Sequence, residues 1–373
     1  MKYLEEYRDP VLAQKLLKSI LHLLEHSPSK IKLMEVCGTH TMNIARAGIR
    51  RLLKDQIALL SGPGCPVCVT HNSYMDQAIA CSREKDVIIA SFGDMIKVPG
   101  SYSSLEKEKA KGADIQVVYS PLDSLKIARE NPGKKIIFLG VGFETTAPTV
   151  AATIRSAREQ NLQNFFVLCG HKIVPPAMKA LVMDPDLRIH GFLCPGHVST
   201  IIGSKPYEFI ARDHGVPCVI AGFEPVDILQ AIEMLLKNII SKAAPCVEIQ
   251  YSRVVKEEGN PRALDIMNNV FEPVDSAWRG LGSIPRSGLA IRDDYREFDA
   301  SIQIQVQVPP IYEHPECRCG EVLRGVTVPP ECPLFRKVCN PENPIGPCMV
   351  STEGTCAAYY KYEELGDNCK TRL

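Results

Sequence analysis

Short apolar runs alternate with amphipathic stretches from about residue 31 to residue 244 of this chain. The runs are rich in Ile, Val, Leu and Phe and contain few polar residues, a pattern typical of parallel strands buried on both faces. We predict eight such strands, at Ile31–Val36, Gln56–Ser61, Asp86–Phe92, Ile115–Ser120, Lys134–Gly142, Phe165–Gly170, Ile189–Gly196 and Val216–Phe223. Helical stretches between the strands complete the pattern of an α/β fold.

Two of the helical stretches carry clear boundary or spacing signals. In 120–130, Ser120 can cap a helix and Pro121 suits its first position. In 224–242, apolar residues recur every three or four positions, as on the buried face of an amphipathic helix. Both stretches are therefore predicted to be helices that pack against a sheet.

The order of the strands along the chain suggests how the protein is divided. Two sets of four strands predict two related parallel-sheet α/β units, residues 1–122 and 123–244, which divide near Ser120–Gly133. A length of 373 residues agrees with two or three domains. We expect a third unit at 245–373, because the pattern changes there.

The third unit is predicted to begin with mixed structure and to end in a cysteine-rich segment. Residues 247–255 and 300–308 alternate like antiparallel strands with one exposed face. An Asn-Pro pair opens a predicted helix over 260–271. From Pro309 onward proline, glycine and cysteine dominate, and such a segment needs a covalent or metal staple to become ordered.

Composition narrows the class of protein. The 43 basic and 43 acidic side chains cancel, so bulk attraction to nucleic acid or to an anionic membrane is not expected. No apolar run reaches the roughly 18 residues that span a bilayer. Residues 1–26 mix charges with leucines at helical spacing, which predicts an amphipathic helix, not a signal peptide, and a cytoplasmic protein.

Cysteine is the unusual feature of the composition. The chain has 15 cysteines, and seven of them fall within the last 57 residues. A cytosolic chain of this size does not need disulfide staples, so clustered cysteines indicate metal or redox chemistry.

Polar and sulfur-containing residues follow the predicted strands, where open parallel sheets form their sites. Cys37 and His40 follow the first strand, with Gly38 allowing close approach to the backbone. Cys65 and Cys68 follow the second strand with the spacing of a redox dithiol, in which one thiol pKa is lowered. A zinc knuckle is the competing interpretation, although no second C-x-x-C lies nearby. If the two strands are neighbours, we expect the three thiols to converge at one sheet edge.

Other strand ends supply secondary candidates. Asp94, Glu144 and His197, together with Thr145 and Thr146, could orient ligands or a partner. The alternative for the threonines is helix capping, because a Pro follows them closely.

Four C-terminal cysteines are candidates for a cofactor. They are Cys332, Cys339, Cys348 and Cys356, separated by six, eight and seven residues. Four thiolates hold either zinc or an iron–sulfur cluster, and the long irregular gaps with neighbouring prolines favour a [4Fe–4S] cluster over paired zinc knuckles. Cys317 and Cys319 compete for the same four positions, and Cys369 lies alone near the end.

Five segments together resemble one known family. They are MEVCGTHT at 34–41, LSGPGCPVCVT at 60–70, GFETTAPT at 142–149, PGHVSTIIG at 195–203, and the cysteine-rich run at 332–362. The chain resembles the hydrogenase maturation factor HypD family essentially from end to end. The resemblance implies two related α/β domains with a cluster domain, in agreement with the pattern described above.

The resemblance also implies a function. Members act in the cytoplasm as scaffolds on which the Fe(CN)2CO unit of [NiFe] hydrogenases is built. It implies that Cys37 binds the transient iron together with a cysteine of a small HypC-type chaperone, and that Cys65 and Cys68 form a redox dithiol. It further implies that the four C-terminal cysteines hold the [4Fe–4S] cluster and that a HypE-type partner donates cyanide. Soft thiolate ligands suit such an iron.

Two hypotheses from different classes follow. The first is an assembly scaffold with redox activity, which leaves open whether the protein is an enzyme. The second is a cluster-linked thiol–disulfide oxidoreductase that acts on protein substrates through Cys65 and Cys68.

Overall fold

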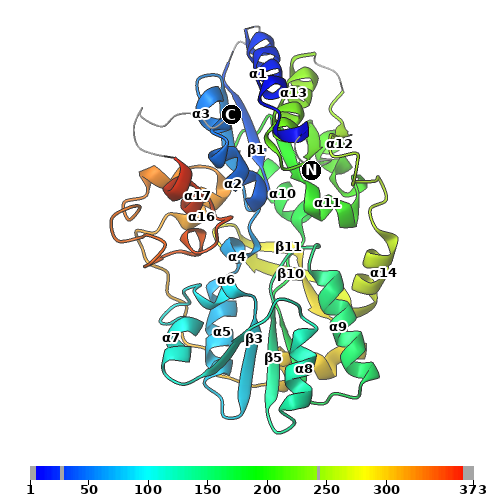
Figure 1. The fold of residues 1–373 in the computed structure, drawn as a ribbon, viewed down its shortest axis with the longest axis vertical. Helices are drawn as coiled ribbons and strands as arrows, with labels where there is room; N and C mark the ends of the chain where they lie inside the picture. The colour runs from blue at the N-terminus through cyan, green and yellow to red at the C-terminus, as the bar shows by residue number, and fades with distance from the viewer. Residues whose placement is uncertain (1–5, 26–28, 242–243, 364–373) are drawn as a thin grey trace.

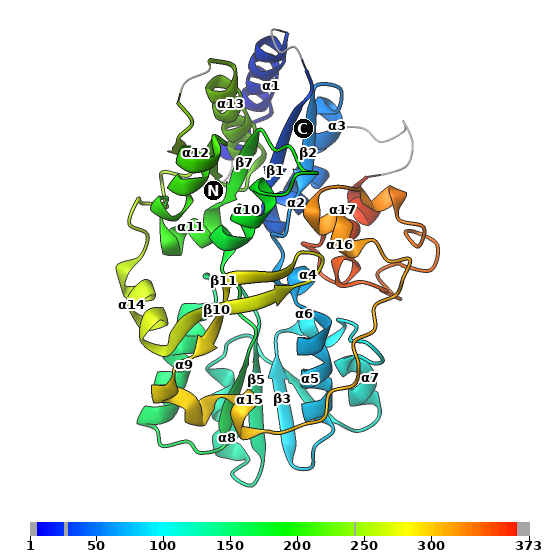
Figure 2. The ribbon, with the colours of Figure 1, turned by 180° about the vertical axis from the view of Figure 1, so that it is seen from behind.

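The computed structural model describes residues 6–25, 29–241 and 244–363. It is an elongated two-lobed α/β structure with a short antiparallel hairpin between the lobes (Figures 1 and 2). Each lobe contains one parallel sheet, of five and four strands. The α/β class with parallel sheets is confirmed.

The upper lobe in Figure 1 is built on the five-stranded sheet, in the order β2-β1-β7-β8-β9. Its strands are β1 (Ile31–Glu35), β2 (Ile57–Ser61), β7 (Gly191–Pro195), β8 (Cys218–Ala221) and β9 (Val247–Ile249). The helices of this lobe are α1 (Pro10–Leu24), α2 (Gly38–Arg46), α3 (Ile49–Leu53), α10 (Val174–Val182), α11 (Gly196–Ile202), α12 (Glu208–His214) and α13 (Pro225–Ser241). The amphipathic helices predicted within residues 1–26 and over 224–242 are found as α1 and α13, which pack side by side.

The lower lobe is built on the four-stranded sheet, in the order β4-β3-β5-β6. Its strands are β3 (Val87–Ser91), β4 (Asp114–Val117), β5 (Lys135–Gly140) and β6 (Phe165–Cys169). Its helices are α4 (Pro66–Val69), α5 (Asn72–Ser82), α6 (Gly93–Ile96), α7 (Leu105–Ala110), α8 (Asp123–Glu130) and α9 (Ala147–Glu159). All five residues of β3 are buried, as expected for a strand covered on both faces.

The grouping of the strands differs from the prediction of two consecutive sets of four. All eight predicted strands are present, but the chain leaves the upper sheet after β2 and returns to it only at β7. Both sheets have apolar residues on both faces. The hydrophobic pattern therefore predicts where the strands are, but it does not indicate which sheet each strand joins. The order of the strands along the chain therefore did not predict which strands form each lobe.

The segment after residue 245 also departs from its prediction. The antiparallel pair is β10 (Phe271–Trp278) with β11 (Gly282–Ile291), which the sequence did not indicate. Val247–Ile249 joins the upper sheet in parallel, and Ala300–Gln303 forms helix α15, because the Asp299 side chain accepts from the Ser301 amide and starts a helical turn.

Helix starts were predicted with mixed success. Helix α14 (Pro261–Val270) has Asn260 as its N-cap, as expected. Helix α8 begins at Asp123, three residues after Ser120, because the Asp123 carboxylate accepts from the amides of Tyr119 and Ser120 and forms a separate turn.

The remaining elements are short. They are the helices α16 (Cys319–Arg324) and α17 (Thr355–Tyr362) and the 3-10 turns η1 (Glu6–Arg8), η2 (Lys205–Tyr207), η3 (Asp293–Phe298), η4 (Pro329–Glu331) and η5 (Pro347–Met349). The C-terminal segment that carries α16 and α17 lies beside α2 and α4 in both views (Figures 1 and 2). This placement brings the cysteine-rich end of the chain to the carboxyl edge of the upper sheet.

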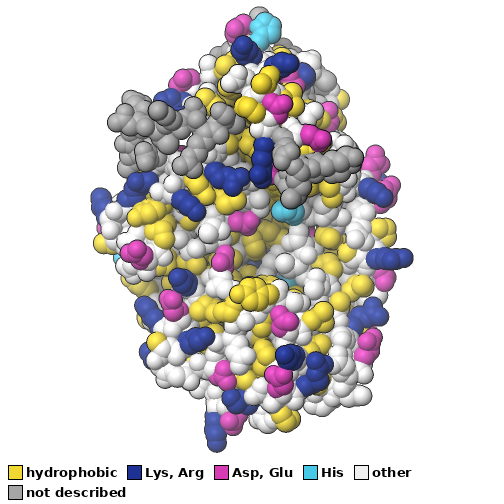
Figure 3. Space-filling model, in the orientation of Figure 1, with side chains coloured by type: hydrophobic (Ala, Val, Ile, Leu, Met, Phe, Trp, Pro, Cys, Tyr) yellow, Lys and Arg dark blue, Asp and Glu magenta, His cyan; other side chains and the backbone are white. Residues whose placement is uncertain are grey.

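The surface agrees with the balanced composition. Basic and acidic side chains are interspersed over the face drawn in Figure 3, and no large area of this face carries one sign of charge. Among the described helices, none combines the length and the apolar character needed to cross a bilayer.

Candidate functional site

The loops that carry Cys37 and the dithiol touch each other. Strands β1 and β2 pair in parallel, with Glu35 opposite Ser61 at their carboxyl ends. Beyond them, the Gly38 amide donates to the Gly64 carbonyl at 2.9 Å. A Cβ atom on Gly64 would lie 2.1 Å from the Cys37 amide nitrogen, so only glycine permits this approach. The two loops therefore meet at one sheet edge, as their positions after neighbouring strands predicted.

Cys37 is held from within the sheet. It precedes α2, and its amide donates to Glu35 Oε2 at 3.0 Å, while the Thr41 hydroxyl donates to Glu35 Oε1 at 2.5 Å. Burial raises the pKa of Glu35 to about 7 and that of Cys37 to about 12. The Cys37 residue as a whole keeps 7% of its surface exposed. Sequence reasoning did not single out Glu35.

The two thiols of the dithiol, Cys65 and Cys68, differ in pKa. Cys65 is the N-cap of α4, and the Cys68 amide donates to its sulfur at 3.3 Å. Burial opposes ionisation of Cys68, but hydrogen bonds from the thiols of Cys348 and Cys65 outweigh it, and the pKa of Cys68 falls to about 6. Burial and the neighbouring Cys68 raise the pKa of Cys65 well above its usual value. Cys68 is therefore the more acidic thiol of the pair as long as Cys348 carries its own proton.

The six cysteines of the C-terminal segment that the structure describes line a single pocket. They are Cys317, Cys319, Cys332, Cys339, Cys348 and Cys356. Apolar side chains, among them Leu334, Phe335 and Met349, form the rest of the wall. Within the described part of the chain, no group of three or more His, Cys, Asp or Glu side chains forms a site for a single metal ion. Cys369 lies outside the described residues.

The donor set of this pocket fits an iron–sulfur cluster. Several thiols surround an apolar space, and the Ile345 amide donates to the Cys339 sulfur at 3.4 Å, a contact of the kind that tunes cluster potentials. The Cys319 and Cys348 sulfurs lie 2.8 Å apart. Cys348 also interacts with Cys68, whose sulfur lies 3.9 Å from the Pro347 carbonyl oxygen. The dithiol and the cysteine pocket are thus in direct contact, which the sequence did not predict.

A carboxylate from the C-terminal segment completes the rim of the site. Glu353 accepts a hydrogen bond from the Thr39 hydroxyl at 2.5 Å, and its Cβ would lie 2.6 Å from a Cβ on Gly38. Its negative charge acts with burial to raise the pKa of Cys37. Sequence reasoning missed Glu353 because it lies 314 residues from Thr39, although it stands within the quoted C-terminal segment.

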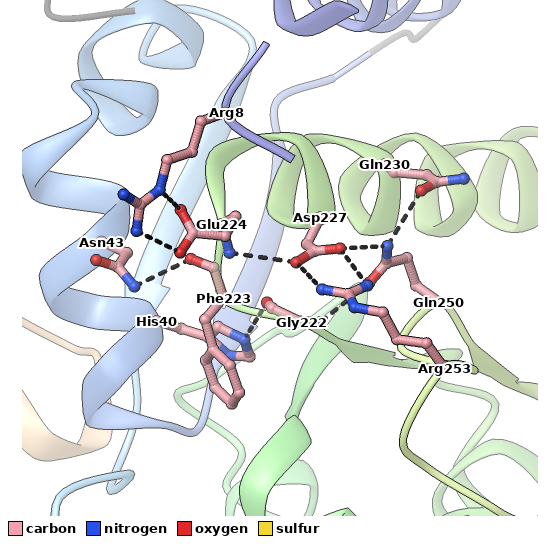
Figure 4. Close-up of polar contacts among 10 residues, drawn as sticks. All are labelled: Arg8, His40, Asn43, Gly222, Phe223, Glu224, Asp227, Gln230, Gln250 and Arg253. Carbon is pink, nitrogen blue, oxygen red and sulfur yellow. Dashed lines mark hydrogen bonds and ion pairs between the residues drawn. The ribbon is translucent and has the colours of Figure 1, made fainter. Parts of the chain in front are cut away.

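His40 is buried and hydrogen-bonds to the loop that follows β8. Its Nε2 lies 2.8 Å from the Gly222 carbonyl oxygen, and Asn43 donates to the Phe223 carbonyl at 3.0 Å (Figure 4). Since a carbonyl can only accept, Nε2 carries the proton. Burial lowers the pKa of His40 to about 4. The His40 side chain therefore acts as a neutral donor that fixes the loop at the end of β8.

The loop that His40 holds is itself anchored by charges. Glu224 accepts two hydrogen bonds from Arg8, at 2.5 and 2.7 Å, and its amide donates to the buried Asp227 (Figure 4). Asp227 in turn pairs with Arg253 at 2.7 and 2.8 Å. The result is a rigid turn beside α2.

The secondary candidates fall in different places. His197 is exposed and stacks on Phe223, with ring centroids 3.9 Å apart, at the edge of the Cys37 region. Asp94 accepts from Ser351 at 3.1 Å, near the segment that carries Glu353. Glu144 is buried, with Oε1 accepting from the Val174 amide at 3.0 Å. Thr146 stands at the N-cap of α9, but its hydroxyl donates to the Phe143 carbonyl instead of capping.

The structure defines an α/β protein with cysteine thiols gathered at a sheet edge and in an adjoining pocket. A family model described as "HypD: Hydrogenase formation hypA family" matches residues 11–363. The chain belongs to the HypD family of hydrogenase maturation factors.

Curated relatives match over their whole length. The hydrogenase maturation factor HypD2 of Bradyrhizobium diazoefficiens is 45% identical over 381 residues, covering 100% of both chains. HypD of Rhodobacter capsulatus is 46% identical and covers 97% of this chain and 98% of its own. HypD of Escherichia coli is 43% identical over 98% of this chain and 99% of its own.

Proposed function

We propose that this hydrogenase maturation factor is a cytoplasmic scaffold on which the Fe(CN)2CO unit of [NiFe] hydrogenases is assembled. The observation that carries the proposal is that three cysteine-bearing segments of the chain touch one another. The Cys37 loop is hydrogen-bonded to the dithiol loop, and Cys68 lies against Cys348 of the cysteine pocket. The 14 described cysteines are all free thiols, as a reducing compartment requires.

Cys37 is the proposed ligand of the iron, which is the substrate. Binding iron displaces the proton that burial otherwise keeps on this thiol. Its small exposed surface permits a second thiolate, from a small HypC-type chaperone, to complete the site from outside. Iron shared between two proteins is held exchangeably, which suits transfer. We further propose that a HypE-type partner delivers the cyanide.

The dithiol is the proposed redox group of the chain. Oxidation of Cys65 and Cys68 to a disulfide releases two protons to solvent and two electrons, which a bound cluster would take up one at a time and pass to an external electron acceptor; reduction reverses this. The thiolate of one cysteine of the pair begins the reaction, and the thiol of the other gives up its proton as the disulfide forms.

The cysteine pocket is the proposed cofactor site. Cys332, Cys339, Cys348 and Cys356 are the proposed ligands, with Cys317 or Cys319 as possible replacements for one of them. When bound there, a [4Fe–4S] cluster supplies one-electron redox chemistry. The chain itself places Cys348 between this pocket and Cys68.

Substitution of Cys37 tests the scaffold. Cys37→Ala is expected to abolish iron loading after co-expression with the small chaperone, with loss of the infrared bands of cyanide and carbon monoxide. The cluster absorbance of the variant is expected to stay unchanged. Cys246→Ala, on an exposed cysteine remote from these loops, is the control and should load normally. A Cys37→Ala complex that retains the infrared bands would refute the role of Cys37.

The second hypothesis is a thiol–disulfide oxidoreductase for protein substrates. The contact between Cys68 and Cys348 supports it, because it connects the dithiol to the cysteine pocket. Burial argues against it, because Cys68 has no exposed surface and Cys65 only 4%, so a protein disulfide cannot reach either sulfur in this conformation. Turnover of a disulfide substrate without a stable complex in size-exclusion chromatography would favour the oxidoreductase. A stable complex with the chaperone and no turnover favours the scaffold.

A further inference from the structure

A second cavity lies outside the site described above. Its volume is about 510 Å³, and its walls come from the loop after β6, the hairpin β10–β11, the start of α5 and the segment around Asp299. Lys172, His171 and His71 are its basic residues, and Ser73 and Ser276 supply hydroxyls. None of these side chains takes part in the function proposed above. The cavity stands at the carboxyl end of a parallel strand, where α/β sheets bind ligands.

Lys172 is the central feature of this cavity. Only 7% of its surface is exposed, and its ammonium group donates to the Ala277 carbonyl at 2.9 Å and to the Ser276 hydroxyl. Among the described residues, no carboxylate forms a salt bridge with it. Burial lowers the pKa of Lys172 to about 8, so the amine is still mostly protonated at neutral pH. A buried cation without a counter-ion is costly, and proteins rarely leave one unpaired.

The surroundings of Lys172 add polar groups and one carboxylate. His171 is 1% exposed, and its Nε2 has no hydrogen-bond partner in the described part of the chain. Asp299 is the acidic residue of the cavity wall, and its Oδ1 is already engaged by the amide and the hydroxyl of Ser301, at 2.8 and 2.7 Å. The site therefore presents the Lys172 ammonium and hydroxyl groups, together with one carboxylate that keeps its negative charge and whose Oδ1 is held by Ser301.

We propose that this cavity binds a small oxyanion, for which Lys172 is the counter-ion. A compact ammonium with neighbouring hydroxyl donors is a common environment for phosphate or carboxylate oxygens. His71 belongs to the wall and comes three residues after Cys68, so the bound anion would sit behind the dithiol loop. The inference is independent of the iron and of the cluster.

Direct binding to the full-length protein tests the proposal. Inorganic phosphate is titrated by calorimetry at constant ionic strength, with chloride as the balancing anion, and acetate is titrated in a second arm. Saturable binding of either anion to the wild type is expected, with at least tenfold weaker binding to Lys172→Gln. Binding of phosphate but not acetate would identify a tetrahedral ligand. Binding of acetate but not phosphate would identify a carboxylate ligand. The control is Lys179→Gln, an exposed lysine of the neighbouring helix α10, which should bind as the wild type does.

Two results would overturn the proposal. One is equal binding by the wild type and Lys172→Gln, and the other is the absence of saturable binding in both arms. Circular dichroism establishes whether Lys172→Gln is folded. If it is not, Ser276→Ala replaces it, because loss of the hydroxyl beside the ammonium is expected to weaken binding several-fold without removing a buried charge.

Discussion

The Thr39 hydroxyl donates to the Glu353 carboxylate across 2.5 Å, and this contact joins segments 314 residues apart in the chain. Thr39 lies in the first turn of α2, two residues after Cys37, whereas Glu353 lies between two cysteines of the C-terminal pocket. The Cys37 loop and the cysteine pocket are thus connected by a polar contact. Glu353 also places a negative charge close to Cys37.

Removal of that charge should make Cys37 more reactive. Glu353→Gln keeps an oxygen that can accept from Thr39 but no longer opposes ionisation of the Cys37 thiol. We expect iodoacetamide to alkylate Cys37 about two to three times faster at pH 8, since the rate follows the thiolate fraction. Peptide mass spectrometry measures the rate at this cysteine. Glu313→Gln, on a half-exposed carboxylate, is the control, and an unchanged or slower rate in Glu353→Gln would contradict the argument.

The contact between the two thiol loops depends on Gly64. Gly64→Ala would place a Cβ 2.1 Å from the backbone nitrogen of Cys37, where backbone has to move. We expect a loss of more than about 3 kcal/mol in the free energy of unfolding, as for other severe steric conflicts. Thermal or urea unfolding measures this loss. Gly133→Ala, at a position with no atom within 4 Å of the added Cβ, should change stability little. Equal effects of the two variants would show that the close approach is unimportant.

The meeting of the Cys37 and Cys65 loops could be predicted from the sequence, because it follows from the geometry of parallel strands. Cys37 and Cys65 follow two apolar runs, and parallel strands that pair bring their carboxyl ends to one edge. Local spacing was therefore enough to predict that the two loops meet. It was also enough to group the C-terminal cysteines, because they lie close along the chain and now line one pocket.

The parts that could not be predicted are contacts between distant segments. Nothing in local spacing indicates that Glu353 would reach Thr39 or that Cys348 would reach Cys68. The division of strands between the lobes failed for the same reason, because β3 and β7 have equally apolar patterns but belong to different sheets. His40 was selected for its chemistry, and only the structure reveals that its Nε2 is engaged by Gly222.

His40 should act through its hydrogen bond. We expect His40→Ala to release the loop at Gly222, to lower the melting temperature and to reduce iron loading several-fold, because the buried carbonyl loses its donor. His40→Gln retains a donor at a similar position and should recover most of both properties. Iron content of the purified complex and thermal unfolding are the two measurements. If His40→Gln is as defective in loading as His40→Ala but melts normally, the imidazole itself takes part in the chemistry.

The buried carboxylate of Asp227 should matter for stability. Asp227→Ala leaves Arg253 and the Glu224 amide without their partner, and we expect a loss of about 3 kcal/mol in the free energy of unfolding. The matched control is Asp213→Ala, which removes a carboxylate from an exposed pair with the adjacent Arg212 and should change stability far less than Asp227→Ala does. Urea unfolding of the three proteins measures the difference. A loss of similar size in both variants would contradict this role of burial.

Glu144 should make the protein less stable as the pH rises. Burial raises its pKa to about 7 from an ordinary value of 4.5, so between these values the folded protein keeps a proton that the unfolded chain releases. The contribution of this group to stability is therefore complete below pH 4.5 and is lost as the pH rises toward 7. Glu144→Gln preserves an acceptor for the Val174 amide and cannot ionise. We expect the urea midpoint of the wild type to fall further than that of the variant between pH 5 and pH 8, by an amount that corresponds to about 2 kcal/mol. Parallel pH dependence of the two midpoints would mean that Glu144 is not protonated in the folded protein.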